Sequence, residues 1–247
     1  MRVLRIGTSN DSAGGLSEQQ RGWWIASDIL AQSTGPPVET VLKRAWPTDS
    51  LPGIVDGWLE ELQPEIVYMQ VSNFWYGHPS VPLWFERRFG RAGKKLTDAG
   101  LAVGKKPWMS DNRFAIGFTR ALVNVLPSAT HFTVDEVARC MEACISRVSS
   151  NERVVLVVRG NDSWEQVPML SHRANARNLQ RNAAMSAAMR AICEKHRVPY
   201  VQTPMVSAAD LRTMLGPARW HASAEGERVS GEFDGAAMVS AWGSAAG

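Results

Sequence analysis

Three polar side chains that could act together in catalysis sit beside predicted strands or helices of this chain. Ser9 lies in the turn that follows a short apolar run at residues 3–6, and Asn73 follows an apolar run at 66–71. His221 stands just before the predicted start of the last helix. A serine hydroxyl becomes a nucleophile when a histidine removes its proton, and an asparagine amide can donate a hydrogen bond to the oxyanion that forms. The chemistry that this set could perform is acyl transfer.

Each of these residues also has a simpler interpretation when it is taken alone. Gly7-Thr8-Ser9 could be an ordinary turn, Asn73 a turn-former, and His221 a structural residue at a loop–helix junction. His78 is a rival base, but it lacks the helix-start context of His221. The order of the three residues along the chain is what favours a shared site.

The elements that must position these residues alternate along the chain. Five short apolar runs are predicted to be strands, at residues 3–6, 38–41, 66–71, 154–158 and 199–201. Helical patterns separate or follow them, from a Ser17–Gln20 capping box to Pro36 and at residues 51–62, 134–148, 172–197 and 223–242. This alternation predicts a three-layer α/β/α fold with a mainly parallel, five-stranded sheet. Chemistry in such sheets collects outside the carboxyl ends of the strands, where Ser9 and Asn73 would lie.

One segment departs from the alternation. Residues 74–132 are irregular, and we interpret them as an insertion that contains one helix near residues 83–89. The prediction is therefore a single domain over residues 1–247 rather than two domains.

Composition excludes several other classes of function. The net charge is only +3, and no run of five basic residues is present, so we predict no nucleic-acid partner. The chain has no apolar signal region at its start and no stretch of about 18 apolar residues, which predicts a cytoplasmic protein without a membrane span. Cys140 and Cys144 are four residues apart but lack a His or Cys partner at ligand spacing, so they and Cys193 are predicted to be buried thiols. We expect neither a metal nor a cofactor.

The three-residue set resembles the SGNH (GDSL-like) hydrolase family, and the resemblance runs through almost the whole chain. The family's Gly-Asp-Ser block is similar to Gly7-Thr8-Ser9, and its Gly-x-Asn-Asp block is similar to the segment ending at Asn73. Its last block, Asp-x-x-His, is similar to Ala218-Arg219-Trp220-His221. The resemblance implies a flavodoxin-like SGNH fold and a serine esterase acting on a small-molecule ester. Ser9 would be the nucleophile and His221 the general base.

The resemblance also implies an oxyanion hole made by the Ser9 N–H, the Asn73 amide and a backbone N–H after the second strand. The family has a Gly at this last place, where the chain has Thr48, whose N–H is retained whereas Pro47 has none. Trp75 and Tyr76 follow Asn73 closely and are candidate substrate-binding residues, although Trp75 could equally be a core residue.

Ala218 stands where the family has the third member of its triad, an Asp that orients the histidine. Three explanations are open. A backbone carbonyl near Ala218 could accept the His221 proton and leave a Ser-His dyad. A carboxylate such as Asp210 or Glu225 could substitute for the missing Asp. The third explanation is a slow or inactive enzyme, because altering the Asp of a triad costs about 10⁴ in kcat.

The sequence therefore favours a serine esterase and leaves two alternatives. One is a binding or accessory protein that keeps the crevice of the fold without its catalysis. The other is an acyltransferase, in which an alcohol or amine replaces water.

Overall fold

The computed structural model describes residues 1–7, 11, 15–77, 80–104, 129–161, 164–165, 170–216 and 222–246. Four residues that matter to the sequence predictions lie outside these ranges: Ser9, His78, Ala218 and His221. Their roles stay predictions, and the structure describes the elements that flank them.

A five-stranded parallel sheet forms the centre of the molecule, with the strand order β2-β1-β3-β4-β5. The strands are β1 (Arg2–Gly7), β2 (Glu39–Arg44), β3 (Ile66–Gln70), β4 (Val155–Arg159) and β5 (Tyr200–Val201). The predicted parallel sheet is confirmed, with strand bounds that differ from the predicted ones by one or a few residues.

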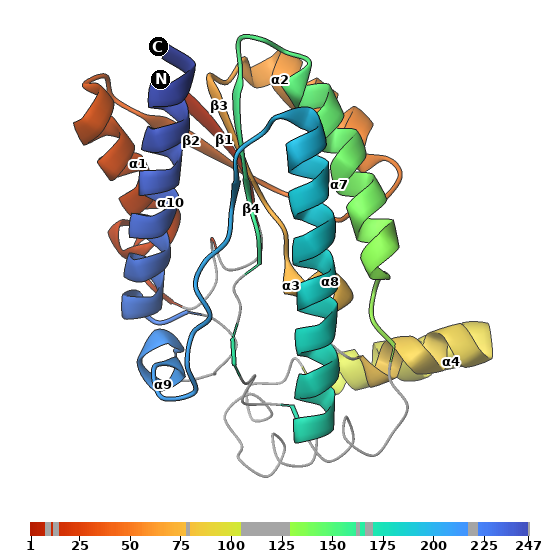
Figure 1. The fold of residues 1–247 in the computed structure, drawn as a ribbon. Helices are drawn as coiled ribbons and strands as arrows, with labels where there is room; N and C mark the ends of the chain where they lie inside the picture. The colour runs from red at the N-terminus through yellow and green to blue at the C-terminus, as the bar shows by residue number, and fades with distance from the viewer. Residues whose placement is uncertain are drawn as a thin grey trace.

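Helices cover both faces of the sheet (Figure 1). One face carries α1 (Gly22–Thr34) and α10 (Ala224–Ala246), which pack against each other. The other face carries α2 (Leu51–Leu62), α7 (Val134–Ser149) and α8 (His172–His196). Shorter or peripheral helices are η2 (Glu18–Gln20), α3 (Asn73–Tyr76), α4 (Val81–Gly104) and α9 (Leu211–Met214). The predicted three-layer α/β/α architecture is confirmed.

Alternate residues of the central strands feed two separate cores, because successive side chains of a strand point to opposite faces. Leu4 and Val67 belong to the core beneath α2, α7 and α8, and Val3 and Ile66 belong to the core beneath α1 and α10. All five residues of β3 are buried. This explains why the run at 66–71 is apolar without alternation.

Local signals fix several helix boundaries. Thr133 and Glu136 form the predicted capping box at the start of α7, with Glu136 N donating to Thr133 Oγ1 at 3.2 Å. The Ser17–Gln20 box is also present, but it opens the 3₁₀ helix η2, and α1 begins only at Gly22. The helix predicted near 83–89 is the first part of α4, which extends further and kinks at Gly90, where φ is 55°.

The irregular segment after α3 is attached to the domain at a narrow point. Ser80 and Ala129 form an antiparallel bridge in which each N–H donates to the other residue's carbonyl, at 2.8 and 3.1 Å. The two ends of the segment between them are thereby held together. Such an attachment fits an insertion into one domain, which stays a prediction.

Candidate active site

The carboxyl ends of β1, β3 and β4 lie on the same side of the sheet, and the chain continues from two of them toward Ser9 and Asn73. Gly7 ends β1, and Ile6 beside it pairs with Met69 of β3. Gln70, the last residue of β3, pairs with Arg159 of β4. Ser9 is two residues beyond the end of β1 and Asn73 three residues beyond the end of β3. Both segments therefore leave the sheet at the edge where catalysis is expected.

Asn73 is held firmly at this edge as the first residue of α3. Its backbone N–H donates to Asn161 Oδ1 at 2.7 Å, which ties the end of β3 to the segment after β4. Its side chain is buried, and its Oδ1 has no hydrogen-bond partner among the described residues. A Cβ added to Gly77 would collide with that oxygen, so Oδ1 points into the protein toward Gly77. The amide Nδ2, on the other side of the same planar group, points away from it.

Trp75 and Tyr76 lie in the core beneath α2, α7 and α8, with only 4% and 1% of their surfaces exposed. Burial raises the pKa of the Tyr76 hydroxyl, with a smaller contribution from Tyr200. The Trp75 carbonyl accepts a hydrogen bond from Phe132 N at 2.9 Å. These positions favour the core-packing alternative for Trp75 and place Tyr76 in the core as well, where both residues hold α3 in place. A substrate-binding role for either residue stays a prediction.

An aromatic cluster that the sequence reasoning missed is exposed next to Asn73. Phe74 and Trp46 are both 47% exposed, and their ring centroids are 5.9 Å apart. The His131 ring lies 5.1 Å from Phe74 and 5.2 Å from Trp46. Partial burial lowers the pKa of His131, and the charge of Arg87 lowers it further. The proximity of Phe74 to Asn73 in the sequence was the available signal, but nothing in the sequence placed Trp46 and His131 beside it.

Thr48 is exposed, and its backbone N–H donates to the Trp46 carbonyl at 2.8 Å. Its own carbonyl accepts from Leu51 N at 2.9 Å, at the start of α2. This N–H could reach an oxyanion only if the turn shares or releases the bond to Trp46. Thr48 as an oxyanion donor stays a prediction.

The segment that contains His221 is closed at both ends. Leu215 and Ala222 form an antiparallel bridge, and Ser223 N donates to Met214 O at 3.0 Å. A Cβ on Gly226 would collide with that same Met214 carbonyl, so the start of α10 packs directly against the end of α9. These contacts hold Leu215 and Ala222, the described residues that flank this segment, next to each other.

The two carboxylates considered as substitutes for the missing triad Asp differ in how they are engaged. Glu225 accepts from Arg228 Nε at 2.9 Å and from Arg228 Nη2 at 2.6 Å, so both of its oxygens are in use. The hydrogen bond from Arg228 lowers the pKa of Glu225. Asp210 accepts from Ser207 Oγ at 2.7 Å and lines the same cavity as Ala222, the residue after His221. Asp210 therefore lies closer to Ala222 than its separation along the chain suggests.

A buried ionic network, which we call the arginine–aspartate network, lies on the α1/α10 face of the sheet. Asp234 of α10 pairs with Arg5 Nη1 and with Arg159 Nε, each at 2.8 Å, and accepts from the Tyr68 hydroxyl at 2.5 Å. Arg5 also pairs with Asp11 at 3.0 Å. Burial would lower the pKa of Arg5, but the charges of Asp11 and Asp234 outweigh it and raise that pKa.

The network fixes Asp11, which stands only two residues after Ser9. A Cβ on Gly7 would collide with the Asp11 carboxylate, so only a glycine allows this approach. Sequence reasoning missed the network. The signal was an arginine within each of two largely apolar strands, Arg5 in β1 and Arg159 in β4.

A row of buried asparagines occupies one side of α8, and it too was missed. Asn175, Asn178 and Asn182 are spaced by three and four residues, which places them on one helical face. Asn178 and Asn182 are 2% and 6% exposed, and the Oδ1 of each has no hydrogen-bond partner among the described residues. Asn178 Oδ1 would also collide with a Cβ on Gly77, so it lies beside Asn73.

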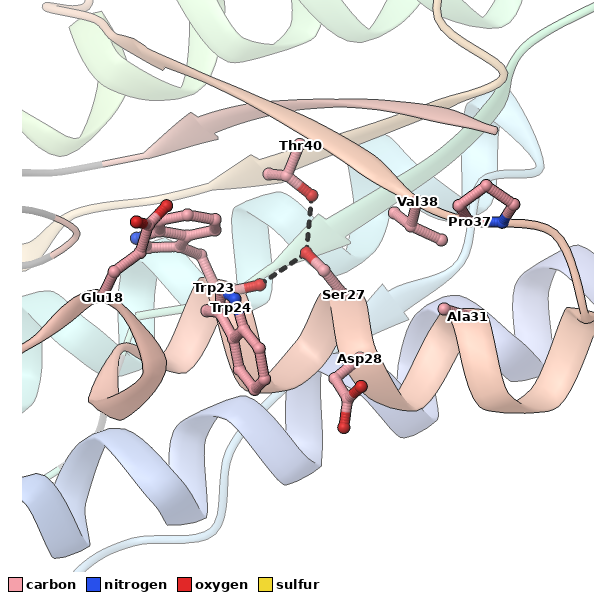
Figure 2. A pocket seen from close by; sticks show the side chains of 9 residues that line it. All are labelled: Glu18, Trp23, Trp24, Ser27, Asp28, Ala31, Pro37, Val38 and Thr40. Carbon is pink, nitrogen blue, oxygen red and sulfur yellow. Dashed lines mark hydrogen bonds between the residues drawn. The ribbon is translucent and has the colours of Figure 1, made fainter.

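Two cavities lie at different ends of the strands. The larger, of about 400 Å³, runs between α1 and the edge strand β2 and is lined by Trp23, Trp24 and Glu18 among others (Figure 2). Ser27 and Thr40 join across it through their hydroxyls, and Thr40 pairs with Val3 near the amino end of β1. The smaller, of about 260 Å³, lies between α9, α10 and the segments that follow β4 and β5. Of these two, it is the smaller that lies at the carboxyl ends of the strands.

Three further predictions concern the cysteines, a metal site and a membrane-spanning helix. Cys140, Cys144 and Cys193 are buried free thiols, as predicted. Within the described ranges, no group of three or more His, Cys, Asp or Glu side chains is arranged to hold a metal ion. None of the helices described is both long and apolar enough to cross a membrane.

Solved structures of G-D-S-L-type proteins resemble this fold over nearly the whole chain. A G-D-S-L family protein from Desulfitobacterium hafniense DCB-2 is 12% identical with a TM-score of 0.53, over 96% of this chain and 98% of that one. The psychrotrophic esterase EstA from a Pseudoalteromonas species is 9% identical with a TM-score of 0.52, over 96% of each chain. Est24, a carbohydrate acetylesterase from Sinorhizobium meliloti, is 12% identical with a TM-score of 0.51, over 98% of each.

At these identities the likeness is one of fold. The chain has the α/β fold of the SGNH hydrolases, as the sequence resemblance predicted. No protein-family model and no curated protein sequence matches the chain.

Proposed function

We propose that this chain is a serine esterase that cleaves its substrate through an acyl-enzyme on Ser9, with His221 as general base. The observation that carries the proposal is the placement of Asn73. It is a buried amide at the carboxyl end of β3, with its backbone pinned by Asn161 and its Oδ1 turned inward. The fold supports the same conclusion by analogy, since solved proteins of this shape include esterases.

The proposed reaction has two steps. His221 takes the proton of the Ser9 hydroxyl as its oxygen attacks the ester carbonyl, and the carbonyl electrons move onto the oxygen. The Asn73 Nδ2 and the Ser9 N–H donate hydrogen bonds to that oxyanion. His221 then gives its proton to the departing alcohol, which leaves an acyl group on Ser9. Water, deprotonated by His221, then attacks this acyl group, and His221 returns that proton to the Ser9 oxygen as the acid leaves.

A Ser-His dyad is the form of the site that we propose. A backbone carbonyl near Ala218 would accept a hydrogen bond from the second imidazole N–H of His221. Glu225 is less suited to this role, because Arg228 already binds both of its oxygens. Asp210 is the remaining carboxylate candidate, through the cavity that it shares with Ala222. An Asp210→Asn variant that keeps its turnover supports the dyad, and one that loses about 10³ to 10⁴ in kcat assigns Asp210 as the third member.

The substrate groups around the carbonyl would lie on two sides. The aromatic cluster of Trp46, Phe74 and His131 is exposed beside Asn73 and offers a wall for the acyl part. Trp75 and Tyr76 support this wall from within the core.

Labelling with a fluorophosphonate probe tests the proposal directly, because the probe reacts only with an activated serine. We expect labelling of the wild type, none of Ser9→Ala, and hydrolysis of p-nitrophenyl acetate that follows the same pattern. Absence of labelling and turnover would contradict the proposal and favour the binding-protein alternative. Product analysis with added alcohol separates hydrolysis from acyl transfer.

A further inference from the structure

The smaller cavity, which we call the α9–α10 cavity, is built almost entirely from apolar side chains. Its walls come from four places in the chain: Trp164 after β4, Met205 after β5, Leu215 after α9, and Val229 and Phe233 of α10. Four of these lining side chains are half-buried: Trp164, Leu215, Val229 and Phe233. A ligand could therefore enter from solvent and still be enclosed by apolar side chains. Pockets of this kind bind apolar groups, because each apolar surface that leaves water stabilises the complex.

The polar groups at its margin are already engaged elsewhere. Asp210 accepts a hydrogen bond from Ser207 Oγ at 2.7 Å. Ser230 Oγ faces Arg159 Nη2 at 3.5 Å, toward the arginine–aspartate network. The cavity therefore offers an apolar ligand few unsatisfied polar atoms to desolvate.

The position of the cavity points to one part of an ester. Ala222 lines it and is joined to His221 by a single peptide bond. Leu215, another lining residue, forms the bridge to Ala222 that anchors this segment. In serine hydrolysis the histidine must protonate the departing oxygen, so the group carried by that oxygen lies next to the histidine. The group next to His221 is thus the alcohol part, whereas the acyl part stays on Ser9.

We propose that the α9–α10 cavity binds the apolar group of the ester's alcohol, an alkyl chain of about four to eight carbons or a ring of similar size. The proposal rests on the esterase function proposed above. The cavity volume of about 260 Å³ sets the upper limit, at roughly 30 Å³ for each water-sized group. Each methylene that enters should improve kcat/KM about three- to fourfold, until the cavity is full.

Two ester series test the assignment. In one, acetate is combined with alcohols from methanol to decanol. In the other, methanol is combined with acids from acetate to decanoate. We expect kcat/KM of the wild type to rise with alcohol length to a plateau between about four and eight carbons. Val229→Trp, which fills the cavity, should reduce the ratio of kcat/KM for hexyl acetate to kcat/KM for methyl acetate at least tenfold. Ala236→Trp, which places the same ring on the exposed side of α10, should keep the wild-type ratio.

A second variant guards against loss of folding in Val229→Trp. Phe233→Ala enlarges the cavity and should move the plateau to longer alcohols. Loss of the acyl-length dependence rather than the alcohol-length dependence in Val229→Trp would overturn the proposal. So would an unchanged alcohol profile in both cavity variants.

Binding of 1-hexanol to Ser9→Ala, measured by calorimetry, separates this inference from the proposed function. Hexanol that binds Ser9→Ala and not the double variant with Val229→Trp supports the cavity as an apolar ligand site, even if no ester is turned over. Ester turnover without such binding overturns the cavity proposal and leaves the esterase intact.

Discussion

The two faces of the sheet carry buried polar groups in opposite states. On the α1/α10 face, Asp234 holds Arg5, Arg159 and the Tyr68 hydroxyl within 2.8 Å, and Asp11 holds Arg5 from the other side. On the α8 face, the amide oxygens of Asn73, Asn178 and Asn182 are buried without hydrogen-bond partners among the described residues.

This contrast suggests different roles for the arginine–aspartate network and the buried asparagines, the first in stability and the second near the candidate active site. A buried ion pair is tolerated only when its hydrogen bonds are satisfied, and breaking it exposes an uncompensated charge. A buried amide oxygen that stays without a partner costs roughly 1–3 kcal/mol, so each member of this group calls for an explanation. The paired face ties β1, β3 and β4 to α10, while the unpaired face adjoins the candidate oxyanion residue.

The largest expected effect comes from breaking the paired face. Asp234→Asn keeps the shape of the side chain but removes the charge shared by Arg5 and Arg159, and should lower the free energy of unfolding by about 3–5 kcal/mol. Urea denaturation measures the loss. Glu142→Gln is the control, because its pair with Lys195 is exposed and should contribute less than about 1 kcal/mol. Equal effects of the two variants would show that the network is not a major source of stability.

The next effect is on rate rather than on stability. Asn73→Ala removes one oxyanion donor and should slow ester hydrolysis by roughly 10² to 10³. Its unfolding midpoint should change little, because the lost Oδ1 has no hydrogen bond to break among the described residues. Asn151→Ala, the same change at an exposed turn before β4 and far from the carboxyl ends of the strands, is the control and should retain the wild-type kcat. An unaltered rate in Asn73→Ala removes this residue from the mechanism.

A smaller effect distinguishes members of the asparagine row. Asn182→Leu replaces a buried amide whose oxygen is unsatisfied and should leave the free energy of unfolding unchanged or raise it by about 1 kcal/mol. Asn175→Leu is the matched change on the same face of α8, at a position where the asparagine Nδ2 donates to the Leu170 carbonyl at 3.1 Å. That variant should be destabilised by about 1–2 kcal/mol, in urea denaturation, because a bonded group is lost. Destabilisation of both would mean that the row is packed for stability.

The sequence predicted the scaffold well and the polar interior poorly, for a physical reason. Strand and helix periods are local, so α2 was predicted with its observed bounds and the sheet as five-stranded and mainly parallel. The arginine–aspartate network joins residues as far apart as Arg5 and Asp234, and no local pattern specifies such a pairing. Trp75 shows the same limit, since the sequence left a pocket wall and core packing equally open, whereas the structure places its side chain in the core.

The smallest effect concerns a carboxyl on the paired face, that of Glu227, whose pKa is raised. Glu227 of α10 is buried and accepts from Gly22 N at 2.7 Å. Burial raises its pKa above the ordinary value of 4.5, and the nearby charge of Asp11 adds to the rise. A raised folded-state pKa means that the folded protein binds this proton more tightly than the unfolded chain does. The contribution of Glu227 to stability is then full below about pH 4.5 and is lost as the pH rises through the folded-state pKa.

Glu227→Gln should therefore gain stability relative to the wild type between pH 4 and pH 7, measured as the difference in unfolding free energy across that range. Glu225→Gln on the same helix is the control of opposite sign. Its pKa is lowered by Arg228, so the wild type should gain relative to that variant as the pH rises. If the two differences in unfolding free energy change with pH in the same direction, then burial does not disfavour the charged form of Glu227. The α1/α10 face would then be fully compensated, and the contrast with the asparagine row would be sharper than the pKa of Glu227 now indicates.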